Sequence, residues 1–212
     1  MKLDLLAIAA HPDDAELTCG GTLAKMVAAG YQVGILDLTR GEMGTRGTPE
    51  IRAREAAAAA KALGLVHREN LGLPDAHLEP SQNYKRKLAA RIRFLRPRTV
   101  ILPYWEARHP DHYNASRLAY EACFLAGLKR LRLEGEPFRP FKILYATMYA
   151  ETVRPSFVVD ISQHFDKRMK AIRCYKSQFT FRPTKGRKVS RAKVEGPQDK
   201  GRGVYFPLHD ME

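Results

Sequence analysis

The sequence predicts an α/β protein with a doubly wound, mostly parallel sheet that carries helices on both faces. Short apolar runs alternate along the chain with longer segments of helical character. Gly30 and Gly64 stand where two of these longer segments end, as is common after a helix. Two of the apolar runs lead into clusters of histidine and aspartate. Ligand sites in open parallel sheets lie at the carboxyl ends of strands, so this placement fits the same architecture.

The apolar runs are the expected strands, because they are short and are flanked by polar or turn-forming residues. They lie at 3–9, 32–38, 69–73, 99–102, 143–148 and 157–160. The expected helices lie at 17–29, 50–63, 82–95 and 113–131, and a last helix runs from an N-cap at Ser162 to about residue 175. The alternation of the two kinds of element makes the expected fold Rossmann-like.

The length of 212 residues is enough for one domain with its own core, which we place at 1–179. Residues 180–212 form an atypical basic tail with neither helical nor strand periodicity, and we expect coil or partial disorder there. No apolar run approaches the ~18–20 residues that span a bilayer. No signal peptide is evident, and three widely spaced cysteines suit reduced thiols, so we expect a cytoplasmic protein.

The net charge of +13 has two sources, the segment 85–98 and the tail. Basic surfaces attract nucleic acids and anionic metabolites. However, Leu88, Ile92 and Leu95 recur at helical spacing beneath the first basic cluster, which is typical of a solvated helix face with one buried stripe. No aromatic interleaving or nucleic-acid motif accompanies the charge, so we expect no nucleic-acid partner and no membrane partner.

Two polar clusters indicate a metal site. Residues 9–16 read AAHPDDAE after the first apolar run, and residues 109–112 read HPDH after the run at 100–103. A catalytic zinc ion takes three protein ligands and keeps one position open. His11, one of Asp13 and Asp14, and one or both of His109 and His112 are the candidate ligands.

The spacing alone does not say which aspartate binds metal. Neighbouring side chains diverge, so one aspartate can bind the metal while the other faces the substrate as a base. The competing interpretation is a polar turn in which an aspartate caps the next helix. A nucleophilic cysteine is a weaker alternative, because a small residue such as Cys19 beside two glycines is equally explained by packing.

These motifs resemble the LmbE-like (PIG-L type) zinc deacetylases, which remove the acetyl group from N-acetylglucosaminyl compounds. The resemblance rests on residues 9–16, on GGTL at 20–23 and on HPDH at 109–112. The stretch TRGEMGTRGT at 39–48, the segment 50–55, LPD at 73–75 and CYKSQF at 174–179 look most like the bacillithiol branch, whose substrate is N-acetylglucosaminyl L-malate. The resemblance covers about residues 3–179.

The resemblance implies a role for each motif residue. It assigns His11, Asp14 and His112 to one zinc ion per chain, which Fe²⁺ could replace. It makes Asp13 the general base. It makes His109, oriented by Asp111, the group that polarises the oxyanion or acts as an acid, and an imidazolium there would add charge stabilisation. Zinc lowers the pKa of water to about 7 and stabilises the oxyanion, which agrees with these roles.

Substrate recognition is assigned to Glu42, Arg52, Asp75 and Arg139, because arginines bind the carboxylates of a malate group well. We expect a small N-acetylglucosamine conjugate as the partner and a homo-oligomeric enzyme. A chitooligosaccharide or glycolipid deacetylase is the alternative with the same chemistry. A nucleic-acid-binding protein with a vestigial site is the alternative of another class. The tail departs from the family pattern, and Tyr205 is only a weak substitute for the tyrosine that closes the site in relatives.

Overall fold

The computed structural model describes residues 1–147 and 153–179, and its centre is a wholly parallel five-stranded sheet in the order β3-β2-β1-β4-β5. The strands are β1 (Leu5–Ala9), β2 (Val33–Thr39), β3 (His67–Leu73), β4 (Thr99–Pro103) and β5 (Lys142–Ala146). This confirms the predicted fold class. The five predicted strands that begin before residue 148 are all present.

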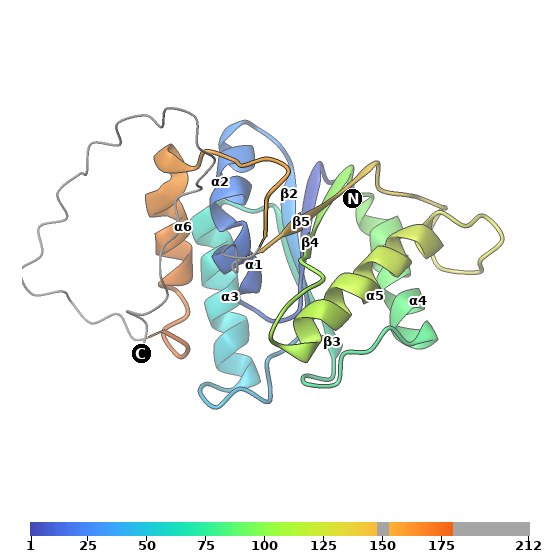
Figure 1. Ribbon diagram of the computed structural model, residues 1–212, viewed down its shortest axis with the longest axis horizontal. Coiled ribbons are helices and arrows are strands. Elements are labelled where there is room, and N and C mark those ends of the chain that lie inside the picture. Colours follow the sequence, from blue (N-terminus) through green and yellow to red (C-terminus); the bar gives the residue numbers. More distant parts are fainter. Residues whose placement is uncertain (148–152, 180–212) are drawn as a thin grey trace, which may run out of the picture.

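Helices cover both faces of the sheet (Figure 1). One face carries α1 (Asp14–Thr18), α2 (Gly20–Ala28), α3 (Pro49–Leu63) and α6 (Phe165–Ile172), and the other carries α4 (Gln82–Leu95) and α5 (Pro110–Ala126). Two apolar cores follow from this arrangement, and alternate residues of β1 divide between them: Leu6 and Ile8 face α4 and α5, whereas Leu5 and Ala7 face the other layer. The period-2 alternation of a strand produces this division.

The direction in which successive strands are added to the sheet changes between β1 and β4. From β1 the chain goes outward to β2 and β3, and it then returns to place β4 on the other side of β1. The loops after β1 and β4 therefore leave the same edge of the sheet on opposite sides of a crevice, which is the position where doubly wound sheets bind ligands.

Several predicted elements differ from those in the structure. The predicted helix 17–29 is two helices, α1 and α2, which meet at Cys19 in a non-helical conformation (φ −134°, ψ 9°). The predicted helix 113–131 begins earlier, at Pro110, and ends at Ala126, where the chain turns through Gly127.

The third error concerns 157–160, which forms no strand although its sequence is apolar. The segment lies beside α2, where Nζ of Lys25 donates to the carbonyl of Asp160, and it pairs with no strand among the described residues. Phe157 and Val158 are exposed. The prediction for the last helix was wrong at both ends. Ser162 is not an N-cap but the first residue of a short 3₁₀ turn, Ser162–His164, and α6 ends at Ile172 and not near residue 175. The carboxylate of Asp160 accepts the backbone N–H of Ser162 at 2.8 Å. The tail 180–212 and Tyr205 lie outside the described residues. Within the described part, the helices are too short or too polar to cross a membrane.

The basic residues of α4 are occupied by local partners. Lys85 pairs with Glu121 at 2.7 Å, Arg91 pairs with Glu69, and Lys87 donates to the carbonyl of Leu71. These basic side chains therefore have partners within the fold, as expected of a helix that buries a leucine stripe against the core.

Arg93 has a separate structural role that the sequence did not reveal. Its side chain is buried and donates to five carbonyl oxygens around the end of α5: those of Ala126, Leu128, Leu131, Leu133 and Gly135. One guanidinium therefore satisfies the carbonyls that the end of α5 and the following loop leave without intrahelical partners.

We expect Arg93→Met to lower the free energy of unfolding by about 2–4 kcal/mol, because several buried carbonyls lose their donor at once. The variant should keep its activity, since this region lies at the opposite end of α5 from His109. Urea unfolding followed by circular dichroism measures the first effect. An unchanged unfolding midpoint would contradict this role.

Candidate functional site

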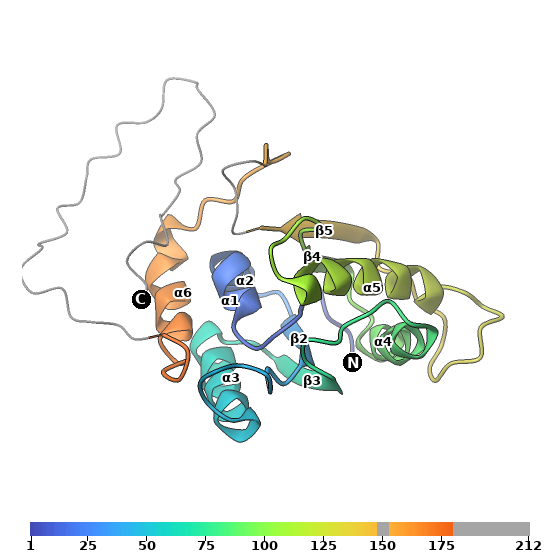
Figure 2. The ribbon, with the colours of Figure 1, turned by 60° about the horizontal axis from the view of Figure 1, so that its bottom comes forward.

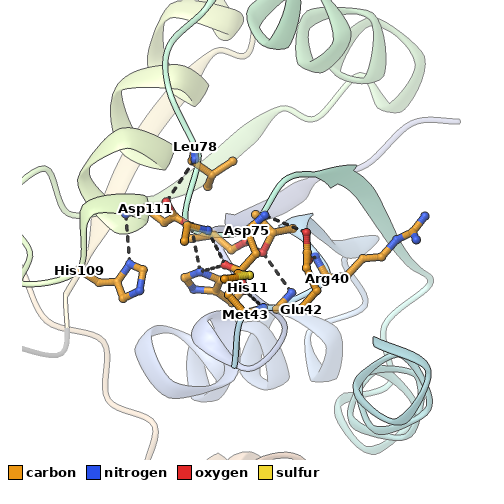
Figure 3. A network of polar contacts seen from close by, with 12 residues as sticks. His11, Arg40, Glu42, Met43, Asp75, Leu78, His109 and Asp111 are labelled. Atoms are coloured by element: carbon orange, nitrogen blue, oxygen red, sulfur yellow. Dashed lines mark hydrogen bonds and ion pairs between the residues drawn. The ribbon is translucent and has the colours of Figure 1, made fainter. Parts of the chain in front are cut away.

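The candidate site forms where the loops after β1, β3 and β4 meet at the carboxyl edge of the sheet (Figure 3). His11 follows β1, Asp75 follows β3, and His109 stands at the N-cap of α5 after β4. The first turn of α5 contributes Asp111 and His112. The topology thus brings together two polar clusters that are about a hundred residues apart in the sequence.

The backbone at Asp13 separates the two adjacent aspartates. Asp13 has a positive φ of 108°, an uncommon conformation for a residue with a side chain. Asp14 begins α1, and its Oδ2 accepts the backbone N–H of His11 at 2.8 Å. Asp13 makes no side-chain cap on α1, so the capping interpretation of this turn does not hold for it.

Asp14 lies between two imidazoles. Its Oδ2 is 3.3 Å from Nδ1 of His11, and its Oδ1 is 3.3 Å from Nε2 of His112. One ligand atom from each of the three residues lies within 4.8 Å of the others. Two imidazole nitrogens and one carboxylate are the donor set of an open catalytic zinc site, so these residues fit a divalent metal. Burial raises the pKa of Asp14, but hydrogen bonds to His11 and His112 outweigh it and lower the pKa.

The other ring nitrogen of His11 faces two further carboxylates (Figure 3). Nε2 is 3.0 Å from Oδ1 of Asp75 and 3.3 Å from Oδ2 of Asp111. Burial opposes protonation of His11, but hydrogen bonds to Asp14 and Asp75 outweigh it and raise the pKa to about 10. Carboxylates on the far nitrogen fix the tautomer and the ring orientation of metal-binding histidines, and this leaves Nδ1 for the ligand side.

The hydrogen bonds of Asp111 differ from the expectation that its carboxylate orients His109. The carboxylate contacts His11 and accepts the backbone N–H groups of Ala76 at 2.8 Å and Leu78 at 3.2 Å. It is the backbone N–H of Asp111 that donates to Nδ1 of His109, at 3.1 Å (Figure 3). Asp111 is buried and holds the loop after β3 against α5, so its side chain serves His11.

The hydrogen bond to Nδ1 also determines the tautomer of His109. A nitrogen that accepts a hydrogen bond carries no proton, so a neutral His109 has its proton on Nε2. Burial lowers the pKa of His109, and the neighbouring imidazoles of His11 and His112 lower it further. The environment therefore favours a neutral imidazole with Nε2–H as a donor, whereas the sequence-based expectation was an imidazolium.

Asp13 is held by Arg52, which the sequence analysis had assigned to substrate. Nη2 of Arg52 lies 3.2 Å from Oδ2 of Asp13 and also donates to the carbonyl of Pro12. Arg52 is 5% exposed and Asp13 is 8% exposed. Burial raises the pKa of Asp13, the charge of Asp14 raises it further, and Arg52 opposes both. A carboxyl with a raised pKa beside a metal site is suited to accept and return a proton.

The remaining predicted substrate residues divide into two groups. Glu42 and Asp75 lie at the site, but their carboxylates already have protein partners: Glu42 accepts the backbone N–H of Asp75 at 2.9 Å, and Asp75 accepts that of Met43 at 2.8 Å. Arg139 does not lie at the site. It stacks on Phe124 and donates to the carbonyl of that residue at the far end of α5, roughly 20 Å from the first turn of the helix at 1.5 Å per residue.

A cleft opens beside Asp14 and His112. Its floor is mainly apolar and comes from the ends of β1, β4 and β5, with Ala9, Ile101 and Ala146 among the lining residues. Cys19 also lines it, but burial raises the pKa of its thiol to about 12, which disfavours the thiolate that a nucleophile needs.

Trp105 stacks on Tyr104, with ring centroids 4.1 Å apart, and packs edge-on against Tyr145.

Sequence reasoning missed a buried charge network behind the site. Arg68 makes a bidentate ion pair with Asp37, and it also contacts Glu16, which receives a hydrogen bond from Tyr175. The available signal was the position of Glu16 at the end of the first polar cluster and of Tyr175 in the CYKSQF segment.

Comparisons with known proteins agree with the site. A family model described as "PIG-L: GlcNAc-PI de-N-acetylase" matches residues 6–123. A diacetylchitobiose deacetylase of Thermococcus kodakarensis is 32% identical over 188 residues, which cover 82% of this chain and 70% of that protein. A Bacillus cereus protein named a probable N-acetyl-α-D-glucosaminyl L-malate deacetylase 2 is 29% identical over 191 residues, which cover 84% of each chain.

A solved structure supports the fold independently. The crystal structure of the conserved protein TT1542 from Thermus thermophilus is 52% identical and superposes with a TM-score of 0.80, covering 84% of this chain and 80% of that one. This chain spans between about half and about two thirds of the length of several other curated relatives. The family model covers more than half of the chain, and its range contains both polar clusters. The chain therefore belongs to the PIG-L (LmbE-like) family of de-N-acetylases.

Proposed function

We propose that this protein is a metal-dependent hydrolase that removes the acetyl group from an N-acetylglucosamine conjugate, with N-acetylglucosaminyl L-malate of bacillithiol biosynthesis as its substrate. The observation that carries the proposal is the meeting of His11, Asp14 and His112 around one point, beside the buried carboxyl of Asp13. We assign the activity to a domain spanning residues 1–179.

His11, Asp14 and His112 would hold the metal, with Zn²⁺ or Fe²⁺ matching the donor set. When bound, such an ion supplies a Lewis acid that polarises the amide carbonyl and lowers the pKa of water to about 7. Asp75 and Asp111 keep the His11 ring in place through its Nε2 atom. This leaves Nδ1 on the side of Asp14, where the other ligand atoms are.

Asp13 acts as the base. It takes a proton from the water that attacks the acetyl carbonyl carbon and returns a proton to the nitrogen as the carbon–nitrogen bond breaks, which yields acetate and a free amine. Arg52 contacts Oδ2 of Asp13. We therefore assign proton transfer to Oδ1, and we treat Arg52 as the group that orients the base.

His109 stabilises the negative charge that develops on the carbonyl oxygen. Because its Nδ1 accepts the backbone N–H of Asp111, its Nε2–H is the donor available to the substrate. A neutral imidazole can fill this role, since a preformed donor aimed at the developing oxyanion is what the transition state requires.

Support for the malate conjugate comes from the Bacillus cereus relative, which matches over 84% of both chains. Arg46 is exposed on the loop that reaches Asp75, and Arg108 is exposed next to His109, whereas the side chain of Arg40 points away from the site (Figure 3). The first two guanidiniums replace Arg52 and Arg139 as our candidates for binding the two malate carboxylates. The Thermococcus kodakarensis relative makes diacetylchitobiose the alternative substrate.

Asp13→Asn is expected to lower kcat by roughly 10²–10⁴-fold, because the amide cannot accept the proton. Metal content should stay unchanged, since Asp14 is the proposed ligand. Steady-state kinetics and metal analysis of the same samples measure both effects. Asp166→Asn, at an exposed aspartate of α6, is the matched control and should behave like the wild type. Loss of metal from the Asp13 variant would show that the roles of the two aspartates are reversed.

Acetate release should be fastest from N-acetylglucosaminyl L-malate, slower from diacetylchitobiose, and absent after treatment with a chelator until metal is added back. An enzymatic acetate assay with the two substrates at equal concentration measures the order. Turnover of diacetylchitobiose alone by the metal-replete protein would reject the malate assignment. No release from either substrate, with salt-sensitive DNA binding instead, would favour the nucleic-acid alternative.

A further inference from the structure

The helix that carries the metal ligand Asp14 is very short. α1 has five residues, Asp14–Thr18, and isolated helices of this length are unstable in water. Asp13, immediately before it, has a strained backbone. Both aspartates therefore depend on tertiary contacts that hold α1 in place.

Two residues from the C-terminal part of the described chain make such contacts. Arg168 of α6 donates to the backbone carbonyls at the end of α1, through Nη2 to Leu17 at 2.6 Å and through Nε to Glu16 at 3.2 Å. Tyr175 is fully buried, and its hydroxyl donates to Oε1 of Glu16 at 2.9 Å. Figure 2 shows α6 alongside α1 and α2.

The side chain of Glu16 is also held by Arg68 of β3. It has no exposed surface, and Nη1 of Arg68 lies 2.5 Å from its Oε1. Arg68 is itself fixed to Asp37 by two hydrogen bonds of 2.9 and 3.0 Å. Oε1 of Glu16 thus receives both Arg68 and Tyr175, whereas Oε2 has no hydrogen-bond partner among the described residues. Removing the tyrosine hydroxyl takes away one of the two donors that this buried carboxylate has in the described part of the chain.

The segment after α6 also contacts α3, the helix that carries the partner of Asp13. Ser177 donates through its backbone and its hydroxyl to Glu55 of α3, at 2.8 and 2.7 Å. Gln178 donates to the carbonyl of Arg46 at 2.8 Å. α3 carries Arg52, which contacts Asp13. The same C-terminal segment therefore contacts both helices that set the two aspartates.

We propose that Arg168 and Tyr175 are positioning residues that hold α1, and through it Asp14 and Asp13, in the arrangement that binds metal and moves the proton. The proposal rests on the proposed function for the roles of the aspartates. It goes beyond that function because neither residue reaches the metal ligands or the cleft. Glu16 connects the two C-terminal residues to the aspartates. Its carboxylate accepts the hydroxyl of Tyr175, its backbone carbonyl accepts from Arg168, and it lies in α1 within one turn of Asp14.

The test compares Tyr175→Phe and Arg168→Met with Arg93→Met in the full chain. Arg93 is the matched control, because it is also an arginine that donates to backbone carbonyls, but at the far end of α5. Metal affinity is measured by Co²⁺ or Zn²⁺ competition with a chromophoric chelator, kcat and KM are measured with substrate, and hydrogen exchange reports the amides of α1.

We expect Tyr175→Phe and Arg168→Met to weaken metal binding by about 10–100-fold, as changes to the contacts that support metal ligands do. They should also lower kcat more than they raise KM and speed exchange of the α1 amides. Arg93→Met should lower the melting temperature without these effects. Arg168→Lys keeps one donor, so it should recover part of the metal affinity and serves as the variant of choice should Arg168→Met not fold.

Unchanged metal affinity and unchanged α1 exchange in both variants, with only a lower melting temperature, would overturn the proposal. Absence of metal binding by the wild-type protein would instead reject the proposed function. In that case the exchange of the α1 amides still decides whether Arg168 and Tyr175 hold this helix.

Discussion

The imidazole of His11 is held from both sides, and the arrangement of the site depends on this contact. Asp14 lies against Nδ1, and Asp75 and Asp111 lie against Nε2, all within 3.3 Å. The three carboxylates come from the first residue of α1, from the loop after β3 and from the first turn of α5. Buried carboxylates are costly unless they are paired, and the His11 ring is a partner that all three of these share. One interaction therefore links the loops after three strands at the edge of the sheet.

The supporting contacts form a second layer on the opposite side of α1. Arg68 on β3 joins Asp37 on β2 to Glu16 on α1, and Tyr175 and Arg168 add the C-terminal segment. Arg52 on α3 supports Asp13 in the same way. The two adjacent aspartates can diverge because the chain takes a positive φ at Asp13 and begins a helix at Asp14. The site thus combines a strained turn with buried ion pairs that hold it, a pattern that is common at functional sites.

The sequence predicted the parallel sheet and the meeting of the two polar clusters, because strand–helix alternation determines both. It did not predict that Asp111 supports His11, since this depends on the loop after β3 folding back to donate Ala76 and Leu78 N–H groups. Arg52 and Arg139 show the same limit: a motif identifies an arginine, but only tertiary packing places one beneath Asp13 and the other at the far end of α5. The apolar segment 157–160 formed no strand, because pairing needs a partner that periodicity cannot reveal.

The central claim is that His11, Asp14 and His112 together bind one metal ion. Elemental analysis of the purified, metal-replete protein beside His112→Ala tests it most directly, because the result depends on no choice of substrate. The account predicts about one Zn²⁺ or Fe²⁺ per chain in the wild-type protein, as in catalytic sites with three protein ligands, and a large loss in the variant. A wild-type protein without metal, or a variant that retains the full amount, would contradict it.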